Sequence, residues 1–484
     1  MKQLSEVQSI CPVCENPIPA FYMERDGRVF LEKHCDTHGD FQALVSNSAA
    51  DYIEWTAHPV VNIPPKTAMT KGSSVDECPL HCGTCENHLQ TACCVLIDIT
   101  KRCNQHCPYC FARAEADAEN PEEPSLEEME AKFDLLVELG EEEVPFNIQL
   151  SGGEPTVRDD LPQIIELAKR KGFEYIQINS NGRRIAREAG YAKKLKQAGA
   201  SVIFMQFDGT TDEIYRKLRG EALWEEKKQA VEQCGKAGLA VALVPTIVRD
   251  VNLENIGEMM QFLLDNLSVV KGIHFQPVSF FVRHPDRCHE GRVTMFDVLH
   301  EIENQCQGFR YEDFCPIATG HTLCCFYSTY LKESDGIKCM VTQKQKAEGV
   351  SCCDTQQDSC CCGQEPTDVI RKDRDYVINK WDLPEPEEAD CGCCGCGTEP
   401  KTAAQSETCC CQGSEPEIMD LDQFLTYYKQ NTFTVTGMAF QDSSNLDAER
   451  LKRCRVQVLS EDNRLVPFCG YNSIYRGEQG EERK

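Results

Sequence analysis

The sequence predicts an α/β fold built on a partial, TIM-like (β/α)6 barrel, with small metal-binding modules at the N-terminal and C-terminal ends. Short apolar runs alternate six times with amphipathic segments between residues 95 and 310, which is typical of parallel strands joined by right-handed helical crossovers. Cysteines at metal-ligand spacings lie before, within and after that region. Six units fit an open barrel better than a closed eight-unit barrel, and reactive groups are expected at the carboxyl ends of the strands.

Each element of the barrel follows from its periodicity. Apolar runs predict strands at 95–100, 147–151, 175–180, 201–207, 240–248 and 272–277. Apolar positions at helical spacing predict helices at 125–139, 160–171, 187–198, 224–237, 255–266 and 295–307. Glycine follows the last apolar position of several helices, as at Gly140, Gly199 and Gly238, and this is a usual stop signal.

Changes in composition divide the chain into five parts. They are an N-terminal metal-bound module at 1–94, the barrel at 95–310, a post-barrel cysteine segment at 311–350, a cysteine-rich low-complexity insert at 351–416 and a C-terminal lobe at 417–484. The insert holds twelve cysteines but too little apolar surface to fold alone. We expect it to be disordered with opportunistic metal binding, the alternative being a metallothionein-like arm that gathers soft metal.

Charge and cysteine content exclude several classes of protein. The formal net charge of −28 argues against a nucleic-acid binder, because phosphate contacts need a basic surface. The N-terminus lacks an apolar signal core, and no stretch approaches the roughly 20 apolar residues of a spanning helix. A cytoplasmic protein is therefore expected, in which 32 cysteines point to metal ligands rather than disulfides.

The motif with the clearest chemistry follows the first predicted strand. Cys103, Cys107 and Cys110 form a CxxxCxxC loop, and three such thiolates can hold three corners of a 4Fe-4S cluster and leave the fourth iron open to a small molecule. The alternative is a structural zinc knuckle with His106 as the fourth ligand. The position of the loop, where a barrel presents reactive groups, favours the cluster.

This loop, with Tyr109 directly before its last cysteine, closely resembles that of the radical SAM superfamily. The resemblance implies that S-adenosylmethionine (SAM) chelates the open iron and is cleaved reductively to a 5'-deoxyadenosyl radical. It makes Cys103, Cys107 and Cys110 the catalytic cluster ligands and places Tyr109 among the cofactor-binding residues.

Polar residues at the ends of the later strands supply the rest of the expected cofactor site. The second strand ends in Gly152, Gly153 and Glu154, where glycine lets the backbone approach a ligand and a carboxylate can accept from an ammonium group. These residues resemble the motif that holds the SAM amine, although tight turns use the same residue types. The other candidates for contact with SAM or substrate are Ser180, Asn181, Gln206, Asp208, Thr246 and Gln276.

Two further cysteine groups precede the barrel. Two close ligand pairs predict a tetrahedral zinc or iron site, as in zinc ribbons and rubredoxin-like folds. Its ligands are Cys11, Cys14, Cys35 and His38. A second CxxxCxxC group predicts a closed auxiliary 4Fe-4S cluster. Its ligands are Cys78, Cys82 and Cys85, with Cys93 as the expected fourth and Cys94 as the alternative.

The order of these motifs narrows the resemblance. Together with Pro467-Phe-Cys469-Gly-Tyr-Asn472, they resemble the radical SAM family of archaeal tetraether lipid synthases and their bacterial relatives, which includes proteins once described as pterin methyltransferases. The resemblance implies a rubredoxin-like iron, several 4Fe-4S clusters and hydrogen abstraction from an unactivated carbon of a lipid chain. The ligands expected for a further auxiliary cluster are Cys315, Cys324 and Cys469, with Cys325, Cys339 and Cys454 as alternatives.

The expected function is therefore hydrogen abstraction from a small-molecule or lipid substrate, with carbon–carbon bond formation as one outcome. A radical methylase or a MoaA-like cyclising enzyme is the alternative within enzymes, and an iron-sulfur electron carrier or metal store is the alternative outside them. A storage protein has no need of six β/α units with polar strand ends. Reduced flavodoxin or ferredoxin is the expected electron donor, with peripheral contact to a membrane if the substrate is a lipid.

Overall fold

The computed structural model describes most of the chain. The described residues are 1–65, 78–80, 82–83, 85–112, 114, 123–140, 146–281, 291–341 and 421–477. The predicted insert at 351–416 lies outside them. Within the described residues, each helix is too short or too polar to cross a membrane.

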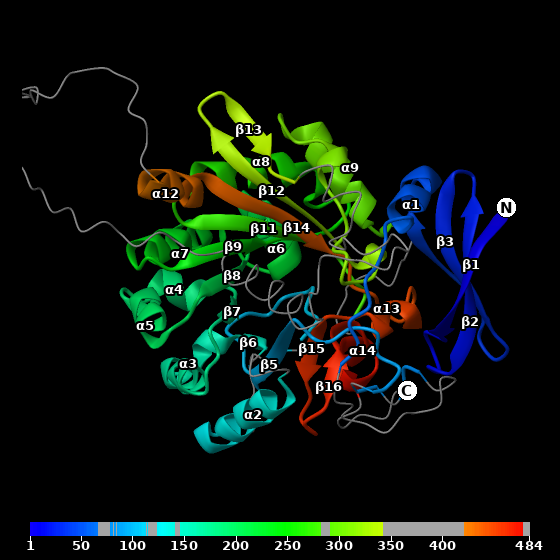
Figure 1. Ribbon diagram of the computed structural model, residues 1–484, viewed down its shortest axis with the longest axis horizontal. Coiled ribbons are helices and arrows are strands. Elements are labelled where there is room, and N and C mark those ends of the chain that lie inside the picture. Colours follow the sequence, from blue (N-terminus) through cyan, green and yellow to red (C-terminus); the bar gives the residue numbers. More distant parts are fainter. Residues whose placement is uncertain are drawn as a thin grey trace, which may run out of the picture.

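A curved sheet, parallel over most of its width, forms the centre of the protein (Figure 1). In spatial order its parallel strands are β15 (Val456–Leu459), β5 (Cys94–Thr100), β6 (Asn147–Gly152), β7 (Ile176–Ser180), β8 (Val202–Gln206), β9 (Ala240–Val244), β11 (Val270–Pro277) and β14 (Thr432–Met438). The remaining strands of this sheet are β12 (Cys325–Glu333) and β13 (Gly336–Cys339) beyond β14, β16 (Leu465–Pro467) beyond β15, and β10 (Thr246–Ile247) beside β11.

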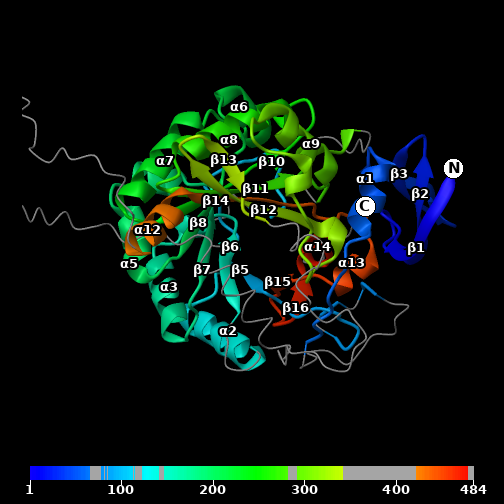
Figure 2. The same cartoon turned by 45° about the horizontal axis from the view of Figure 1, so that its top comes forward.

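Helices cover the outer side of this sheet, as Figure 2 shows for the ring that runs from α2 through α7 to α9. Their bounds are α2 (Leu126–Leu139), α3 (Leu161–Arg170), α4 (Arg183–Arg187), α5 (Tyr191–Ala198), α6 (Asp212–Arg219), α7 (Trp224–Lys236), α8 (Ile256–Asp265), α9 (Met295–Gln305), α12 (Leu421–Asn431), α13 (Ala448–Lys452) and α14 (Phe468–Ser473). A strand covered on both faces must be apolar throughout, and all five residues of β9 are buried.

The predicted α/β barrel is confirmed, with local differences that have physical causes. The predicted strand at 240–248 is two strands, because Pro245 has no N–H to donate to the ladder. The predicted helix at 187–198 is interrupted at Gly190, which has a φ of +79°. The helix α6 was not predicted from the sequence.

The C-terminal residues do not form a lobe apart from the barrel. β14 pairs with β11 at one edge of the six predicted strands, and β15 pairs with β5 at the other edge, both in parallel. β14 spans Thr432–Met438, within the segment 417–484 that was expected to form this lobe. The barrel sheet is therefore wider than the six predicted units, and its added strands come from the end of the chain.

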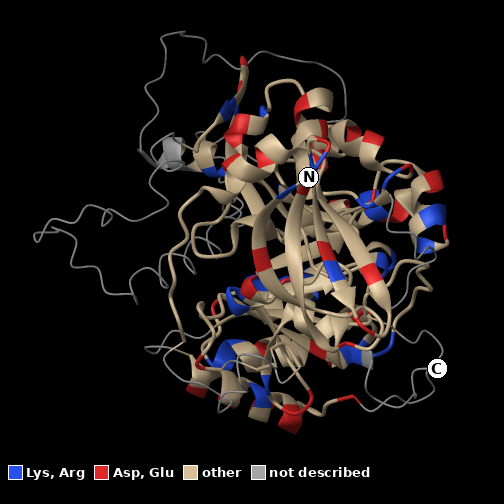
Figure 3. Ribbon diagram, turned by 90° about the vertical axis from the view of Figure 1, so that its right-hand side faces the viewer, with Lys and Arg blue, Asp and Glu red and all other residues tan. Residues whose placement is uncertain are grey.

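The N-terminal module is an antiparallel meander followed by one helix. Its elements are β1 (Lys2–Ile10), β2 (Pro17–Arg25), β3 (Arg28–Cys35), β4 (Gly39–Ser46) and α1 (Ala49–Thr56). Figure 3, which views the protein from the side of this sheet, shows acidic and basic residues interspersed along its strands. Because the chain reverses after each strand, the connections after β1 and after β3 lie at the same end of the sheet.

Buried polar contacts join the N-terminal module, the barrel and the C-terminal residues. Tyr22 donates to the Asp447 carboxylate over 2.8 Å, and Trp55 donates from Nε1 to the carbonyl of Thr322 over 2.7 Å. Arg292 forms an ion pair with Asp442 at 2.7 Å, and the two side chains are only 4% and 1% exposed. Burial opposes the charge on Asp442, but Arg292 outweighs it and holds the pKa of this carboxyl below its usual value.

We predict that Asp442→Ala lowers the free energy of unfolding by about 3–5 kcal/mol, because it leaves the Arg292 charge buried and unpaired. The matched control is Glu461→Ala, whose partner Lys101 and own side chain are both 55% exposed, and it should cost less than about 1 kcal/mol. Because the pKa of Asp442 is lowered on folding, its contribution is present at neutral pH and lost as the pH falls below about 4. Urea denaturation at pH 7 measures both variants, and equal losses would contradict the prediction.

Candidate active site and metal centres

The cluster loop, residues 101–112, leaves the carboxyl end of β5 and brings three thiols together. Burial raises the pKa of the Cys103 thiol to about 12, and the nearby charges of Glu154, Cys107 and Cys110 add to the rise. The structure therefore places all three predicted ligands next to one another and next to the predicted SAM-binding glutamate.

The thiols of the cluster loop are not gathered as closely as the ligands of the N-terminal site. A zinc ion holds its sulfur ligands about 4 Å apart. Among the described residues, only the ligand atoms of Cys11, Cys14, Cys35 and His38 form a group that all lie within 4.8 Å of one another. The thiols of the cluster loop do not form such a group among the described residues, and the 4Fe-4S cluster on them stays a prediction.

Gly152 and Gly153 let the end of β6 pack directly on the start of the cluster loop. A Cβ atom at Gly152 would lie 2.1 Å from the carbonyl oxygen of Thr100, and one at Gly153 would lie 2.1 Å from that of Arg102. The Gly153 N–H donates to the Thr100 carbonyl and the Glu154 N–H to the Arg102 carbonyl, each over 2.8 Å. These glycines are therefore required by backbone packing, whatever else they contact.

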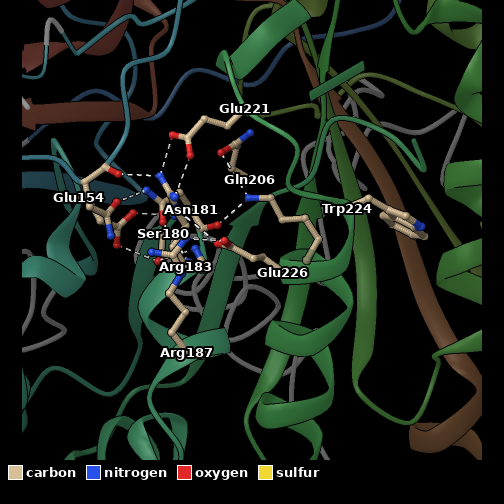
Figure 4. Close-up of polar contacts among 12 residues, drawn as sticks. Glu154, Ser180, Asn181, Arg183, Arg187, Gln206, Glu221, Trp224 and Glu226 are labelled. Carbon is tan, nitrogen blue, oxygen red and sulfur yellow. Dashed lines mark hydrogen bonds and ion pairs between the residues drawn. The ribbon is translucent and has the colours of Figure 1, made fainter. Parts of the chain in front are cut away.

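The Glu154 side chain ties the end of β6 to the end of β7, as Figure 4 shows. It is 1% exposed. Its Oε1 atom accepts from the Thr156 N–H and hydroxyl over 3.1 and 2.6 Å and from the Ser180 hydroxyl over 2.8 Å, and its Oε2 atom accepts from the Asn181 N–H over 2.6 Å. Three donors crowd Oε1, so Oε2 is the atom with capacity left for the predicted ammonium contact.

Asn181 and Arg183 hold the cluster loop from the end of β7. Asn181 donates from Nδ2 to Oδ1 of Asn104 over 2.7 Å. Arg183 donates to the Asn104 carbonyl over 2.7 Å and forms two hydrogen bonds of 2.9 Å with Glu221, which lies beside it in Figure 4. Sequence reasoning missed Arg183 and Asn104. The sequence could have indicated both residues, since Arg183 follows a predicted strand end and Asn104 lies between two predicted cluster ligands.

A buried ion pair between Asp208 and Arg219 braces the other side of the loop. The carboxylate accepts from Arg219 over 2.7 Å at each oxygen and from the Thr246 N–H over 3.1 Å. Gln206 also donates to it. Burial opposes its charge, but Arg219 keeps the pKa of Asp208 below the usual value. Asp208 is thus fully engaged within the protein, and its contact with SAM or substrate stays a prediction.

Arg219 connects this ion pair to the cluster loop through hydrogen bonds. It donates from Nη1 to the Tyr109 carbonyl and from Nη2 to the Thr246 hydroxyl, each over 2.9 Å. It also hydrogen-bonds the Cys107 thiol, where its charge offsets part of the rise in pKa that burial causes. Sequence reasoning missed Arg219 because α6 was not predicted.

Lys227, also missed, lies buried behind the strand ends. It donates to the Asn181 carbonyl over 2.5 Å and to Oε1 of Gln206 over 3.4 Å, and burial lowers its pKa to about 8. Gln206 is therefore positioned by the protein at the end of β8. The last predicted site residue, Gln276, pairs with Thr246 where β10 meets β11, so both lie at neighbouring strand ends.

The N-terminal site has the geometry predicted for it. The Cys14 and Cys35 sulfur atoms are 3.9 Å apart. Nδ1 of His38 lies 3.6 Å from the Cys11 sulfur and 3.5 Å from the Cys35 sulfur. These distances are those of ligands around one tetrahedral metal ion, which the two connections at the same end of the meander bring together.

The other cysteines form two groups, and Cys93 lies near the second. In the first group, Cys78 and Cys85 add to the rise in the pKa of Cys82 that burial causes. Cys93 instead adds to the rises in the pKa of Cys94 and of Cys325, so it lies beside the post-barrel cysteines. The second group, defined by such mutual effects, comprises Cys93, Cys94, Cys315, Cys324, Cys325, Cys454 and Cys469.

Arg450 lies beside this second group, whereas Cys339 lies outside it. Arg450 is buried beside it and donates from Nε to the Cys324 sulfur over 3.5 Å. Cys339 pairs with Tyr330, five residues along β12 from Cys325, a separation of roughly 17 Å at the usual rise per strand residue. Cys339 is therefore not part of the group.

Comparison with known proteins gives the class. Residues 97–263 match the radical SAM superfamily, and residues 3–47 match the HMPTM N-terminal zinc ribbon domain. The protein is therefore a radical SAM enzyme with an N-terminal zinc ribbon, and the predicted superfamily is confirmed.

A full-length relative gives the family. The 7,8-dihydro-6-hydroxymethylpterin dimethyltransferase of Methanocaldococcus jannaschii is 32% identical over 510 residues, which covers 98% of this chain and 94% of that protein. The chain belongs to the family of this dimethyltransferase. Two shorter matches are the Fe-coproporphyrin III synthase of Methanosarcina barkeri, 37% identical over 32% of this chain and 38% of that protein, and a probable GTP 3',8-cyclase of Sulfolobus acidocaldarius, 28% identical over 45% of this chain and 68% of that protein.

We predict that Gly153→Ala removes iron from the cluster loop, because the added methyl group would force the loop away from β6. The iron and acid-labile sulfide content of the anaerobically reconstituted protein should fall by about four atoms of each per chain, one cluster. Gly291→Ala is the control, since a Cβ there meets no atom within 4 Å. If both variants load the same amount of iron, the packing argument is wrong.

Proposed function

We propose that this enzyme cleaves SAM reductively and takes a hydrogen atom from an unactivated carbon of an apolar substrate, a lipid chain above all. The observation that supports it best is the convergence of Cys103, Cys107 and Cys110 with Glu154 at the carboxyl ends of parallel strands. When bound, the 4Fe-4S cluster supplies the electron that splits SAM into methionine and a 5'-deoxyadenosyl radical.

The protein's own residues would hold this site rigid. Glu154 and Asn181 fix the strand ends that face the cluster loop, while Arg219 fixes the loop itself through the Tyr109 carbonyl. Such bracing matters because a reactive radical must meet one carbon atom only, and positioning is the main task of the protein in cofactor chemistry. Ser180, Gln206, Thr246 and Gln276 remain our candidates for contact with SAM or substrate.

An aromatic cluster beside the loop supports an apolar substrate. Phe111 directly follows the last loop cysteine, is 40% exposed and lies 5.7 Å, between ring centres, from Phe468. Phe468 in turn packs on Phe440 at 4.4 Å and on Phe281 at 6.3 Å. This aromatic wall of phenylalanine rings offers apolar contact to an alkyl chain.

The two groups of cysteines outside the loop are proposed to hold auxiliary 4Fe-4S clusters. Cys469 follows Phe468 in the chain, so the second group lies next to the aromatic wall. An auxiliary cluster there could accept the electron left on the substrate, or hold a substrate-derived radical until a carbon–carbon bond forms. Reduced flavodoxin or ferredoxin is the proposed electron donor, in the cytoplasm, with peripheral contact to a membrane for a lipid substrate.

Methylation of a pterin is the second candidate function. It is favoured by the name of the full-length relative, a dimethyltransferase acting on a hydroxymethylpterin. The aromatic wall suits a planar ring as well as an alkyl chain, since both gain from stacking on phenylalanine. The two candidates share SAM cleavage and differ in the carbon that loses hydrogen.

We predict that Cys107→Ala abolishes formation of 5'-deoxyadenosine, because the two remaining thiolates are too few to hold the cluster. The assay is anaerobic, with reconstituted protein, dithionite and SAM, and chromatographic detection of the nucleoside. Cys234→Ala is the control, since this buried thiol lies on α7 away from the loop and burial alone raises its pKa. Cleavage retained in Cys107→Ala would refute the ligand assignment, and no cleavage by the unchanged protein would make it an electron carrier or metal store.

We predict that deuterium from a perdeuterated alkyl lipid appears in 5'-deoxyadenosine, because the radical takes its hydrogen atom from the substrate. Mass spectrometry of the nucleoside measures the transfer. Phe468→Ala should reduce the transfer from the lipid without lowering cleavage of SAM in its absence. Transfer from a deuterated hydroxymethylpterin and none from the lipid would instead establish the second candidate.

A further inference from the structure

The loop that carries Cys78, Cys82 and Cys85 is held by the C-terminal residues. The Cys82 N–H donates to the Tyr475 hydroxyl over 2.6 Å, and that hydroxyl donates to the Pro79 carbonyl over 2.8 Å. Arg464 donates to the Cys82 carbonyl over 2.9 Å. The three thiols are therefore positioned by the fold, and their mutual effects on pKa show that they are neighbours.

His88 ends the same loop with a buried nitrogen atom that has no partner. The side chain is 4% exposed, and Nδ1 is buried without a hydrogen-bond partner in the described structure. The ring hydrogen-bonds the Lys452 carbonyl, and since Nδ1 is free of partners, Nε2 is the donor. Leaving a buried acceptor unsatisfied costs about 1–3 kcal/mol, so this atom calls for a ligand.

The ring is in the form that binds metal. With Nε2–H bonded to a backbone carbonyl, Nδ1 keeps a free lone pair, which is the usual arrangement of a metal-bound histidine.

The described contacts connect His88, rather than Cys93, to the loop that carries the three thiols. The backbone N–H of His88 donates to the Cys85 carbonyl over 3.0 Å. The His88 ring and the Cys78 thiol both lie near Lys452. Cys93 donates its N–H to the Arg455 carbonyl and lies beside Cys325. Cys93, the fourth ligand expected from the sequence, thus lies near the other cysteine group.

We propose that Nδ1 of His88 is the fourth protein ligand of a 4Fe-4S cluster whose other ligands are Cys78, Cys82 and Cys85. The CxxxCxxC spacing of the three cysteines, which repeats that of the cluster loop, favours an iron-sulfur cluster over a zinc ion. This assignment rests on the auxiliary cluster proposed above and not on the reaction or its substrate.

A neutral nitrogen ligand changes the electrochemistry of the cluster. Replacing one thiolate by imidazole removes one negative charge, and histidine ligation raises the reduction potential of iron-sulfur centres. The cluster would therefore be reduced more readily than one with four thiolates. This property suits a centre that takes up an electron after the radical step.

Pulsed EPR on histidine-labelled protein tests the assignment without any use of SAM. The full chain is prepared with Cys103, Cys107 and Cys110 changed to alanine, so that the SAM-binding cluster is absent and the result is independent of catalysis. After reconstitution with iron and sulfide and reduction by dithionite, we expect a strong 14N hyperfine coupling, replaced by a 15N coupling when histidine is 15N-labelled.

Three further substitutions in this background assign the nitrogen. His88→Cys should keep the iron content, abolish the coupling and lower the reduction potential of the cluster, and His88→Ala should also lose the coupling. Cys93→Ser, the matched control, should keep both the coupling and that potential. No histidine coupling in the parent protein would overturn the proposal, as would a coupling that survives in His88→Cys or disappears in Cys93→Ser.

Discussion

The buried ion pair of Asp208 and Arg219 is the interaction on which the reactive end of the barrel depends. The cluster loop has no helix or strand of its own, so its shape must come from side chains that reach it from elsewhere. Arg219 supplies this by holding the Tyr109 carbonyl and the Cys107 thiol. A guanidinium buried so deeply is stable only with a partner, because losing one half of such a pair leaves an unpaired charge at a cost of about 3–5 kcal/mol. Asp208 therefore acts on the loop through Arg219.

The C-terminal residues link the metal groups that the sequence keeps far apart. They extend the barrel sheet at both edges and hold the Cys78–Cys85 loop through Tyr475 and Arg464. They also supply Cys454 and Cys469 to the second cysteine group. Phe468 lies between that group and Phe111 of the cluster loop. The aromatic wall thus lies between the cluster loop and the second cysteine group.

Much of this arrangement could be predicted from the sequence, and the rest depends on long-range contacts. The six central strands, the cluster loop and the N-terminal ligands are local patterns with fixed spacing, and the structure has them. The short helix α6 was missed because it is very polar, although Thr211 caps its start and Gly220, with φ of +83°, ends it. A linear sequence shows that Cys93 is near Cys85 but not that it lies near Cys325. The pairing of β15 with β5 is equally non-local.

The central claim is that the cluster loop leaves one iron atom open for SAM. Electron–nuclear double resonance on the reduced, reconstituted protein tests this directly, using SAM labelled with 15N in the amine and 17O in the carboxylate of its methionine part. The account predicts hyperfine couplings from both labels, lost in protein without the loop cysteines. If neither label couples to the cluster while SAM is bound, a protein side chain already occupies the fourth iron, and the assignment of this site is wrong.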